Sequence, residues 1–509
     1  MCCAAAWAGI IDKTARRISA DGLMIPAFMR TIVSSRLRRL RKLILDMRPE
    51  PDSPYLYDAS GMRGCASEVL IPENEAALSQ ILRDASSSGT PVTISGSGTG
   101  VTGGRVPDGG WLVSLEKLNT VRVEKGYAVC GAGASLAAIQ AAAAPTKQFY
   151  APDPTENSAS IGGTVSTNAS GSRSFLYGDT RRHIRALRVV LANGEILALR
   201  RGEKAPWEIP VLPAPDVKKN TAGYFLRPGM DYMDLFIGAD GTLGVVSEVE
   251  VQLLDVPKNL FTGVVFFDSD ARALDAVDQW RPVASLRMLE YVDAASLDVV
   301  RSRFPEIPHE ARVALMIEQD VSSGEDAEEA WLDRLEASDA LTDDSWFAAS
   351  ATDRERFRRF RHGLAEAVNE IIRQRGLMKA NSDFAVPLAR SRDILQLYRD
   401  TLDREFPGQY VIFGHIGDAH VHINVLPPNK AEWERAMGLM KEFAAAAVGM
   451  GGTVSAEHGL GKRKRDYLKL QFTPDQIETM RSVKRRLDPQ WLLGRGTLFE
   501  VPVARPKNP

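Results

Sequence analysis

Short apolar runs separated by polar or glycine-rich turns fill the first half of the chain. Such runs, rich in β-branched residues, are typical of strands, whereas longer stretches with an apolar residue every three or four positions are typical of helices. We predict strands at 67–71, 92–94, 112–114, 121–123 and 128–130, helices at 73–85 and 135–143, a hairpin over 184–197 and an alternating strand over 245–253. This mixture predicts an α+β fold.

The pattern changes after Asp255-Val256-Pro257, so we place a domain boundary near residue 258. Beyond it we expect an apolar strand over 262–267, an acidic helix around 325–336, a basic helix over 354–361 and a return strand over 487–499. The predicted parts are a basic N-terminal helical segment (1–60), a first domain (61–258), a second domain (259–485) and a C-terminal return segment to the first domain (486–509).

Composition and charge narrow the class of protein. With 44% hydrophobic and 25% charged residues among 509, the chain has the composition of an ordinary globular protein of two or three domains. Its 63 basic and 65 acidic residues leave a formal net charge of −2, so no nucleic acid is expected as a partner. The four cysteines lack iron–sulfur or zinc spacing, which indicates a reducing compartment and no internal electron relay.

The N-terminus is basic, since residues 1–45 hold nine lysines and arginines but only Asp12 and Asp21 as acids. An apolar stretch precedes these charges, which disfavours a secretory signal, and no run of about 18 apolar residues predicts a transmembrane segment. We expect a cytoplasmic protein, with a peripheral contact at the inner membrane left open. Mitochondrial targeting by the basic N-terminus is an alternative.

Three glycine-dense loops lie in the first predicted domain. Seven glycines fall within 95–110, where Gly96-Ser97-Gly98-Thr99-Gly100 can turn several backbone N–H groups toward one pyrophosphate. The loop lacks the following helix and acidic partner of a dinucleotide-binding Rossmann fingerprint. The second loop, 152–172, carries Gly162-Gly163, and the third covers 238–244. Each alone is typical of a tight turn, but together they predict a fold that cradles a cofactor.

Four of the seven histidines fall between residues 415 and 458. His420, His422 and Asn424 alternate with apolar residues, so on a strand they share one face. Together with His415 and Glu457, this stretch offers two imidazoles and a carboxylate, enough to hold a divalent metal with open positions for a substrate. The alternative is a hydrogen-bonded histidine network at a domain interface.

Residues 95–107, 150–179 and 236–248 resemble the three flavin-contacting signatures of the vanillyl-alcohol oxidase / p-cresol methylhydroxylase superfamily. The chain resembles in particular its FAD-linked D-2-hydroxy acid dehydrogenases, which include D-lactate dehydrogenase, the glycolate oxidase flavin subunit and D-2-hydroxyglutarate dehydrogenase. The likeness covers residues 62–500 and implies an FAD-binding domain of the p-cresol methylhydroxylase type plus an α+β cap domain for substrate and metal. No histidine stands in 150–179, so we expect non-covalent FAD.

The resemblance places the flavin contacts in the three loops. They are Ser95, Gly96, Ser97, Gly98, Thr99, Gly100, Thr102, Gly103, Pro152, Thr155, Ser160, Gly162, Gly163, Thr167, Asn168, Gly171, Asp240, Gly241, Gly244 and Val245. The chain departs from the family pattern at Asp240, where a glutamate is usual, at Ser95, often an arginine, and at 494–496, where Gly-Arg-Gly replaces Asn-Pro-Gly. These departures put the C-terminal flavin contact in doubt.

The resemblance also implies a metal site and a base. His415, His422 and Glu457 match the family's ligands for zinc or a similar divalent ion, and His458 matches the base. Ala419-His420 replaces the family's usual Gly-Asn, so His420 is either a bystander or an extra polar contact.

Two further residues match the family's substrate contacts. Asn424 follows the second histidine, and Arg361 matches an arginine that pairs with the substrate carboxylate. The alternative for Arg361 is an ordinary salt-bridging helix arginine.

The implied reaction is oxidation of a small D-2-hydroxy acid, D-lactate above all, with a hydride passing to flavin N5. The electrons would leave to an external acceptor, such as a quinone, a cytochrome, an electron-transferring flavoprotein or an iron–sulfur subunit. Where dicarboxylate enzymes hold a second carboxylate stand Ala365 and Asn381, although Lys379 lies two residues away. D-2-hydroxyglutarate or glycolate are alternative substrates. A metal-dependent hydrolase with the same histidines and glutamate would leave the glycine loops unexplained.

Overall fold

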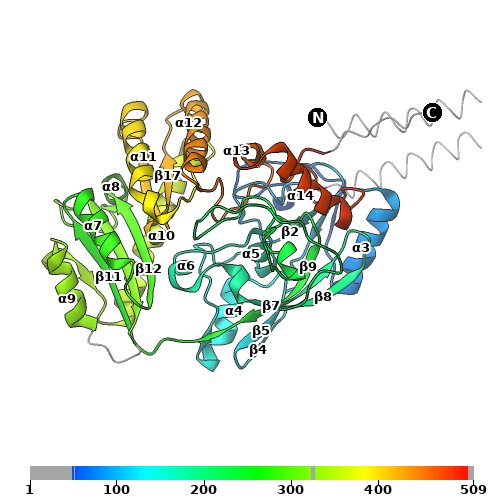
Figure 1. The fold of residues 1–509 in the computed structure, drawn as a ribbon, viewed down its shortest axis with the longest axis horizontal. Coiled ribbons are helices and arrows are strands. Elements are labelled where there is room, and N and C mark those ends of the chain that lie inside the picture. Colours follow the sequence, from blue (N-terminus) through cyan, green and yellow to red (C-terminus); the bar gives the residue numbers. More distant parts are fainter. Residues whose placement is uncertain (1–48, 51, 322–326, 502–509) are drawn as a thin grey trace, which may run out of the picture.

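The computed structural model describes residues 49–50, 52–321 and 327–501, and its elements carry the labels of Figure 1. The chain forms two lobes, joined at the bottom of that view by an extended connection that follows β9. Of the N-terminal helical segment predicted for 1–60, residues 1–48 and 51 lie outside the described residues. In the remainder, Pro54–Leu56 forms a short 3-10 turn, η1.

The first lobe contains two main sheets. A parallel sheet has the strand order β1-β3-β2, and an antiparallel sheet has the order β4-β5-β9-β7-β8. The strands and helices predicted between residues 67 and 253 are present to within a few residues. The strands are β1 (Glu68–Leu70), β2 (Val92–Ser95), β3 (Trp111–Ser114), β4 (Val121–Glu124), β5 (Tyr127–Gly131), β7 (Ile184–Val190), β8 (Ile196–Arg200) and β9 (Val245–Gln252), with β6 (Gln148–Phe149) paired to β10 (Leu254–Asp255).

Four helices of this lobe, α3, α4, α5 and α14, begin at a residue whose side chain caps the first turn. At the start of α3 (Glu75–Ser88) the Asn74 side chain accepts a hydrogen bond from the Ala77 N–H, and Ser160 caps α5 (Ile161–Thr167) in the same way. The other elements are α4 (Leu136–Ala143), α6 (Ser174–Tyr177), α13 (Leu468–Gln471), α14 (Pro474–Leu487), η2 (Ala144–Thr146), η3 (Thr180–His183), η4 (Tyr232–Leu235) and η8 (Arg465–Tyr467).

An antiparallel seven-stranded sheet forms the centre of the second lobe, in the order β14-β11-β13-β12-β16-β17-β15. Val264 and Phe266 of β11 share a core with α8 and α10, whereas Val265 and Phe267 share one with α7 and α9. Helices therefore cover both faces, and the central strands β12 and β13 are buried at almost every position. The strands are β11 (Leu260–Phe267), β12 (Leu286–Asp293), β13 (Val313–Asp320), β14 (Trp346–Phe347), β15 (Ala380–Asn381), β16 (Tyr410–His415) and β17 (His420–Val425).

The helices of the second lobe include both charged helices expected from the sequence. The acidic one is α9, whose described part begins at residue 327, and the basic one falls inside the long helix α10. The elements are α7 (Asp270–Trp280), α8 (Ala294–Val300), α9 (Ala327–Ala337), α10 (Ala351–Gln374), α11 (Ser391–Glu405), α12 (Lys430–Gly449), η5 (Thr342–Asp344), η6 (Leu388–Arg390) and η7 (Ile416–Asp418).

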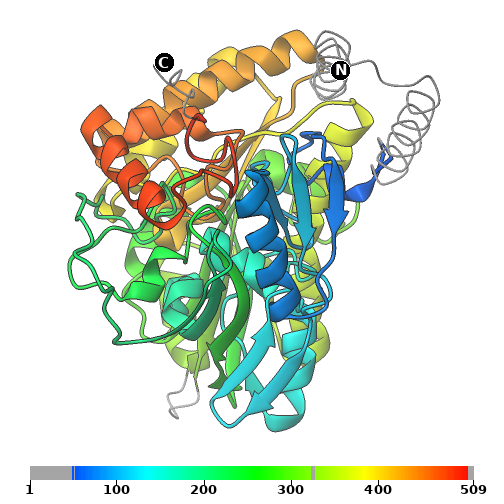
Figure 2. The same cartoon turned by 90° about the vertical axis from the view of Figure 1, so that its right-hand side faces the viewer.

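The C-terminal segment returns to the first lobe, but the return strand predicted for 487–499 is wrong. The segment has no regular strand: Leu493 forms an isolated bridge with Val92 of β2, and the Gly494 N–H donates to the Val92 carbonyl at 2.9 Å. Left-handed backbone at Trp491, Gly494 and Gly496 breaks any extended run. Figure 2 shows this red segment beside the blue strands of the first lobe.

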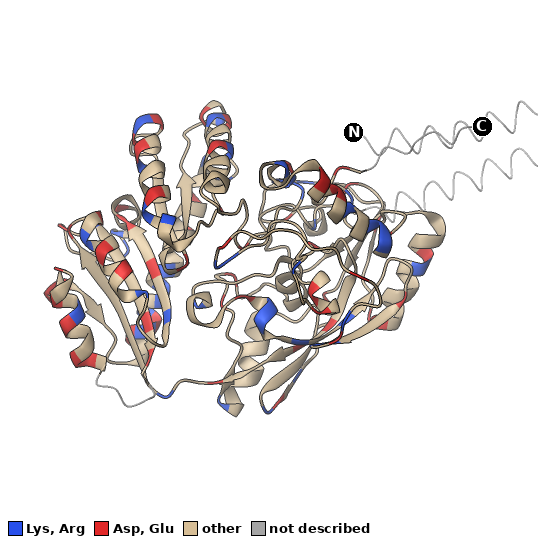
Figure 3. Cartoon of the chain, viewed as in Figure 1, with Lys and Arg blue, Asp and Glu red and all other residues tan. Residues whose placement is uncertain are grey.

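Charges of both signs are spread over the two lobes. Figure 3 shows lysine and arginine interspersed with aspartate and glutamate along the outer helices, in keeping with the near-zero net charge. No helix within the described ranges is long and apolar enough to cross a membrane.

Candidate functional site

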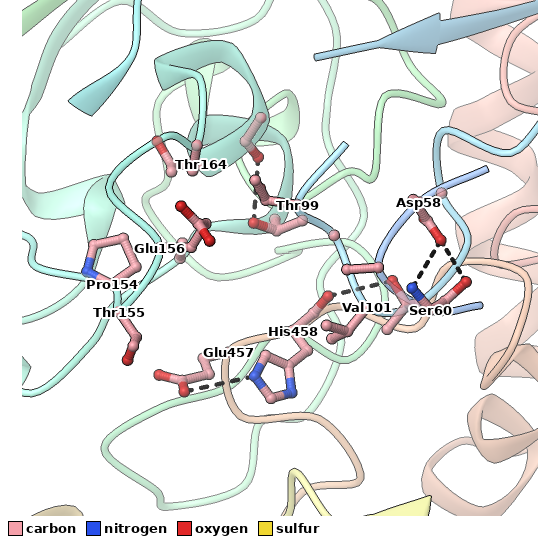
Figure 4. Close-up of a pocket in the computed structure, with 18 of the residues that line it drawn as sticks. Asp58, Ser60, Thr99, Val101, Pro154, Thr155, Glu156, Thr164, Glu457 and His458 are labelled. Atoms are coloured by element: carbon pink, nitrogen blue, oxygen red, sulfur yellow. Dashed lines mark hydrogen bonds and ion pairs between the residues drawn. The ribbon is translucent and has the colours of Figure 1, made fainter. Parts of the chain in front are cut away.

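A cavity of about 840 Å³ lies between the two lobes (Figure 4). The first lobe supplies the three glycine loops and residues 58–61, and the second supplies parts of β12, α10, β16 and β17 together with Glu457 and His458. The volume is in the range of sites that enclose a cofactor or a drug-sized ligand. Residues 58–60 lie inside the N-terminal segment predicted for 1–60, and no sequence motif predicted any of these four residues at a site.

Sixteen of the twenty residues expected at the flavin line this cavity. They are Gly96, Ser97, Gly98, Thr99, Gly100, Thr102, Thr155, Ser160, Gly162, Gly163, Thr167, Gly171, Asp240, Gly241, Gly244 and Val245. The structure therefore brings all three loops to one place, from positions up to about 150 residues apart.

Four expected residues, Ser95, Gly103, Pro152 and Asn168, do not line the cavity. Ser95 is fully buried and donates a hydrogen bond to the Gly96 carbonyl. Asn168 is the left-handed cap of α5, and its side chain donates to Asp179 at 2.7 Å. Ser95 and Asn168 therefore support the loops without lining the cavity. A sequence motif marks such supporting residues and the lining residues alike.

Glycine is required where the loops approach each other. A Cβ atom at Gly96 would lie 2.4 Å from Ser160 Oγ, so a larger residue there would displace the side chain that caps α5. A Cβ atom at Gly104 or Gly241 would meet nothing within 4 Å, so a side chain there would extend into open space. A cradle of this kind, wide and made of backbone, fits a large flat cofactor such as FAD.

Two carboxylates take part in the cavity wall. Asp240 accepts a hydrogen bond from the Gly461 N–H at 3.1 Å, and burial raises its pKa to about 6. Asp58, which the sequence analysis missed, holds Ser60 with Oδ1, while its buried Oδ2 has no hydrogen-bond partner. Burial raises the pKa of Asp58 as well. An acceptor left without a donor in this position suits a ligand that carries hydroxyl groups.

The histidines and the glutamate meet on the second-lobe side of the cavity. His415, His420, His422 and Glu457 each offer one donor atom, all within 4.8 Å of one another. Glu457 Oε1 lies 3.3 Å from Nε2 of both His415 and His422. Ligands about 2.0–2.1 Å from a tetrahedral zinc ion are about 3.3 Å apart, so this donor set fits such an ion. His420 belongs to the cluster and is more than a distant bystander.

The rear nitrogens of the two imidazoles are already occupied. His415 Nδ1 donates to Glu290 at 2.5 Å, and His422 Nδ1 donates to the Ser382 carbonyl at 3.1 Å. In the neutral form of each ring Nε2 then carries the lone pair and can bind a cation beside Glu457 Oε1, the arrangement typical of metal-ligating histidines. Burial opposes a proton on His415, but Glu290 outweighs it and raises the pKa of this ring.

His458 lies beside Glu457 at the cavity wall, and Figure 4 shows their contact. Its Nδ1 is 3.5 Å from Asp383, a fully buried carboxylate that also accepts the His458 backbone N–H at 3.0 Å. His420 approaches the same carboxylate at 3.3 Å. Burial lowers the pKa of His458 to about 4, so at neutral pH this imidazole is uncharged. No motif in the sequence pointed to Asp383.

Arg361 is both a salt-bridging residue and a cavity residue. Its Nε donates to Glu290 at 3.1 Å and its Nη1 to Thr155 at 3.3 Å, while the side chain lines the cavity. Asn424, nearly fully buried on β17, lines the same cavity. Glu290 holds Arg361 and His415 together, and it too was missed, because it lies within a fully buried strand.

The chain was compared with known protein families and structures. Residues 66–200 match the FAD binding domain family, and residues 256–498 match the C-terminal domain of FAD linked oxidases. Glycolate oxidase subunit GlcD of Bacillus subtilis is 30% identical over 458 residues, which cover 87% of this chain and 92% of the relative. The chain belongs to the FAD-linked oxidase family. FAD is therefore its cofactor, and the metal-dependent hydrolase alternative falls away.

Other relatives of this FAD-linked oxidoreductase act on different hydroxy acids. A D-2-hydroxyglutarate dehydrogenase of Xanthomonas citri is 29% identical and covers 85% of this chain and 89% of its own. A D-lactate dehydrogenase of Archaeoglobus fulgidus is also 29% identical, covering 88% and 95%. A solved structure of alkyldihydroxyacetonephosphate synthase has a TM-score of 0.61 at 16% identity and covers 84% of this chain and 76% of its own, which shows the shared fold.

Proposed function

We propose that this FAD-linked oxidoreductase converts a small D-2-hydroxy acid, such as D-lactate, into the 2-oxo acid and passes the electrons to an acceptor outside the chain. One observation carries the proposal: Arg361, the His415–His422–Glu457 cluster and His458 line the same cavity as the flavin loops. The names of the relatives support the substrate class.

In this proposal the second lobe binds and orients the substrate. Arg361, with its plane fixed by Glu290 and Thr155, pairs with the carboxylate, and Asn424 offers its amide to the same molecule. A divalent cation such as zinc at His415, His422 and Glu457 would polarise the hydroxyl oxygen and lower its pKa.

His458 is the proposed base. It takes the hydroxyl proton as the C2–H bond breaks and the C2–O bond becomes a carbonyl, so that the substrate loses two electrons and two protons. Non-covalently bound FAD supplies the acceptor for the electron pair of the C2–H bond. Asp383 holds the His458 backbone and lies beside the ring, which keeps the imidazole directed at the substrate.

One observation favours a second candidate, oxidation of D-2-hydroxyglutarate. Lys379 lines the cavity, as do Ala365 and Asn381. The cations Arg463 and Lys464 act on Lys379, so the positive potential around it would attract the second carboxylate of the substrate. The ratio of kcat/KM for D-lactate to that for D-2-hydroxyglutarate decides between the two candidates. If kcat/KM is at least tenfold higher for the dicarboxylate, a difference of about 1.4 kcal/mol, D-2-hydroxyglutarate is the substrate instead of D-lactate.

Anaerobic stopped-flow mixing tests the proposed function. D-lactate should bleach the flavin absorption of the purified protein, whereas L-lactate should not. His458→Asn should retain FAD and slow flavin reduction by on the order of 10²-fold or more, the usual size of a lost general base. The proposal fails if D-lactate, glycolate and D-2-hydroxyglutarate all leave the flavin oxidised.

A further inference from the structure

The two carboxylate oxygens of Glu457 have different surroundings. Oε1 faces the two imidazoles of the candidate metal centre. Oε2 faces the first lobe, where it accepts a hydrogen bond from Ser170 Oγ at 2.7 Å and one from the Gly171 N–H at 3.3 Å. The ammonium group of Lys219 lies 3.2 Å from the same oxygen. Three donors of the first lobe therefore converge on one oxygen of a residue from the second half of the chain.

Lys219 is buried, with 3% of its side chain exposed, so its charge needs compensation. Its Nζ reaches the Gly171 carbonyl at 3.3 Å and Asp418 at 3.5 Å besides Glu457. These acceptors all lie on other segments, since Lys219 itself stands in the loop between β8 and η4.

We infer that Lys219 and Ser170 are positioning residues that reserve Oε2 of Glu457 and leave Oε1 alone for a metal ion. Glu457 then acts as a one-oxygen ligand, as suits a tetrahedral zinc site more than the multiple oxygen ligands of calcium. The inference rests on the proposed metal centre. It also means that the flavin-binding lobe orients a ligand of the other lobe, through the loop that carries the expected flavin contact Gly171.

The test is a zinc titration of the FAD-loaded, full-length protein against a competing chelator. Lys219→Met should keep FAD and weaken zinc binding by about 10- to 100-fold, the usual cost of removing a group that orients a metal ligand. Lys219→Arg should restore part of the affinity. Lys218→Met is the matched control, because Lys218 lies next in the chain but is exposed, and its zinc affinity should equal that of the unsubstituted protein.

The sign of the change separates positioning from simple charge balance. If Lys219 only offset negative charge, its removal would tighten zinc binding, and an unchanged or tighter Kd would overturn the inference. Ser170→Ala changes no charge and should also weaken zinc binding. It decides the question if Lys219→Met loses FAD and so fails to fold. A lack of zinc binding by the unsubstituted protein would instead overturn the proposed metal centre, and this inference with it.

Discussion

The imidazoles of His415 and His422 are fixed before any ligand arrives. In each ring Nδ1 donates a hydrogen bond, one to Glu290 and one to the Ser382 carbonyl, so in the neutral form of each ring the lone pair is on Nε2. Neither ring needs to change its tautomer or turn over to bind a cation. The hydrogen bonds of the two Nδ1 atoms therefore preorganise both rings for a metal ion.

Removing one ligand should empty the proposed metal centre and spare the flavin. Glu457→Ala and His422→Ala each delete one of three protein donors, so we expect loss of bound zinc and of most turnover with FAD content unchanged. Zinc is measured by mass spectrometry and FAD by absorbance after gel filtration. His309→Ala, at an exposed histidine, is the control. Full zinc occupancy in either site variant would remove that residue from the ligand set.

The pH dependence of substrate choice should report on Lys379. Burial, with Arg463 and Lys464, lowers the pKa of this lysine to about 8, so its ammonium form is present below that pH and lost above it. If it binds a second carboxylate, kcat/KM for D-2-hydroxyglutarate falls as the pH rises through this pKa, relative to that for D-lactate. Lys379→Met should abolish the difference. Parallel profiles for both substrates in the unsubstituted protein would show that Lys379 does not contact the second carboxylate.

At the scale of elements, the features predicted from the sequence are those whose residues lie close together along the chain. Strands such as β2 and β9 were predicted because β-branched or alternating residues mark them, and the histidines were singled out because four of the seven fall between residues 415 and 458. β12 is buried at every position, including Glu290, so it shows no alternation that would reveal an acidic residue facing a cavity.

Partners from distant segments could not be predicted. Asp383 lies 75 residues before His458, the residue whose backbone it holds, and no spacing pattern links the two. The return strand failed for a different reason, because its apolar pair Leu492-Leu493 is too short to form a strand between left-handed residues. Contacts between distant segments decide both the position of Asp383 and the conformation of the C-terminal segment.

The end of helix α14 offers a test of stability. Lys484 Nζ lies 2.5 Å from Asp488 and donates to the carbonyls of Thr242 and Leu493 at 2.6 and 3.0 Å, all out of contact with water. Lys484→Met leaves a buried carboxylate without its cation, and we expect the free energy of unfolding to fall by about 3–5 kcal/mol.

Its neighbour provides the control. Arg485 pairs with Glu478 on the exposed face of the same helix, and Arg485→Met should cost under about 1 kcal/mol. Urea unfolding of the FAD-loaded protein measures both changes. Equal losses in the two variants would contradict the special weight given to the buried pair.

At the scale of the whole molecule, the two lobes share one cavity and exchange contacts on several sides of it. Arg173 of the first lobe pairs with Glu318 of β13 at 2.9 Å, and Asp240 holds the loop that follows His458. Contact between the lobes therefore brings the flavin loops and the proposed substrate residues to the same cavity.

The return of the C-terminal segment to Val92 has a consequence for the timing of biosynthesis. Leu493, which bridges to Val92, and the cavity residue Gly494 are synthesised after the whole second lobe. The first lobe therefore cannot be completed when residues 61–258 leave the ribosome. Translation at about 5–20 residues per second makes that wait roughly 10 to 50 s, during which the edge of β2 has no partner. Nascent chains arrested at residue 487 should accordingly bind no FAD, while chains released at full length should acquire it.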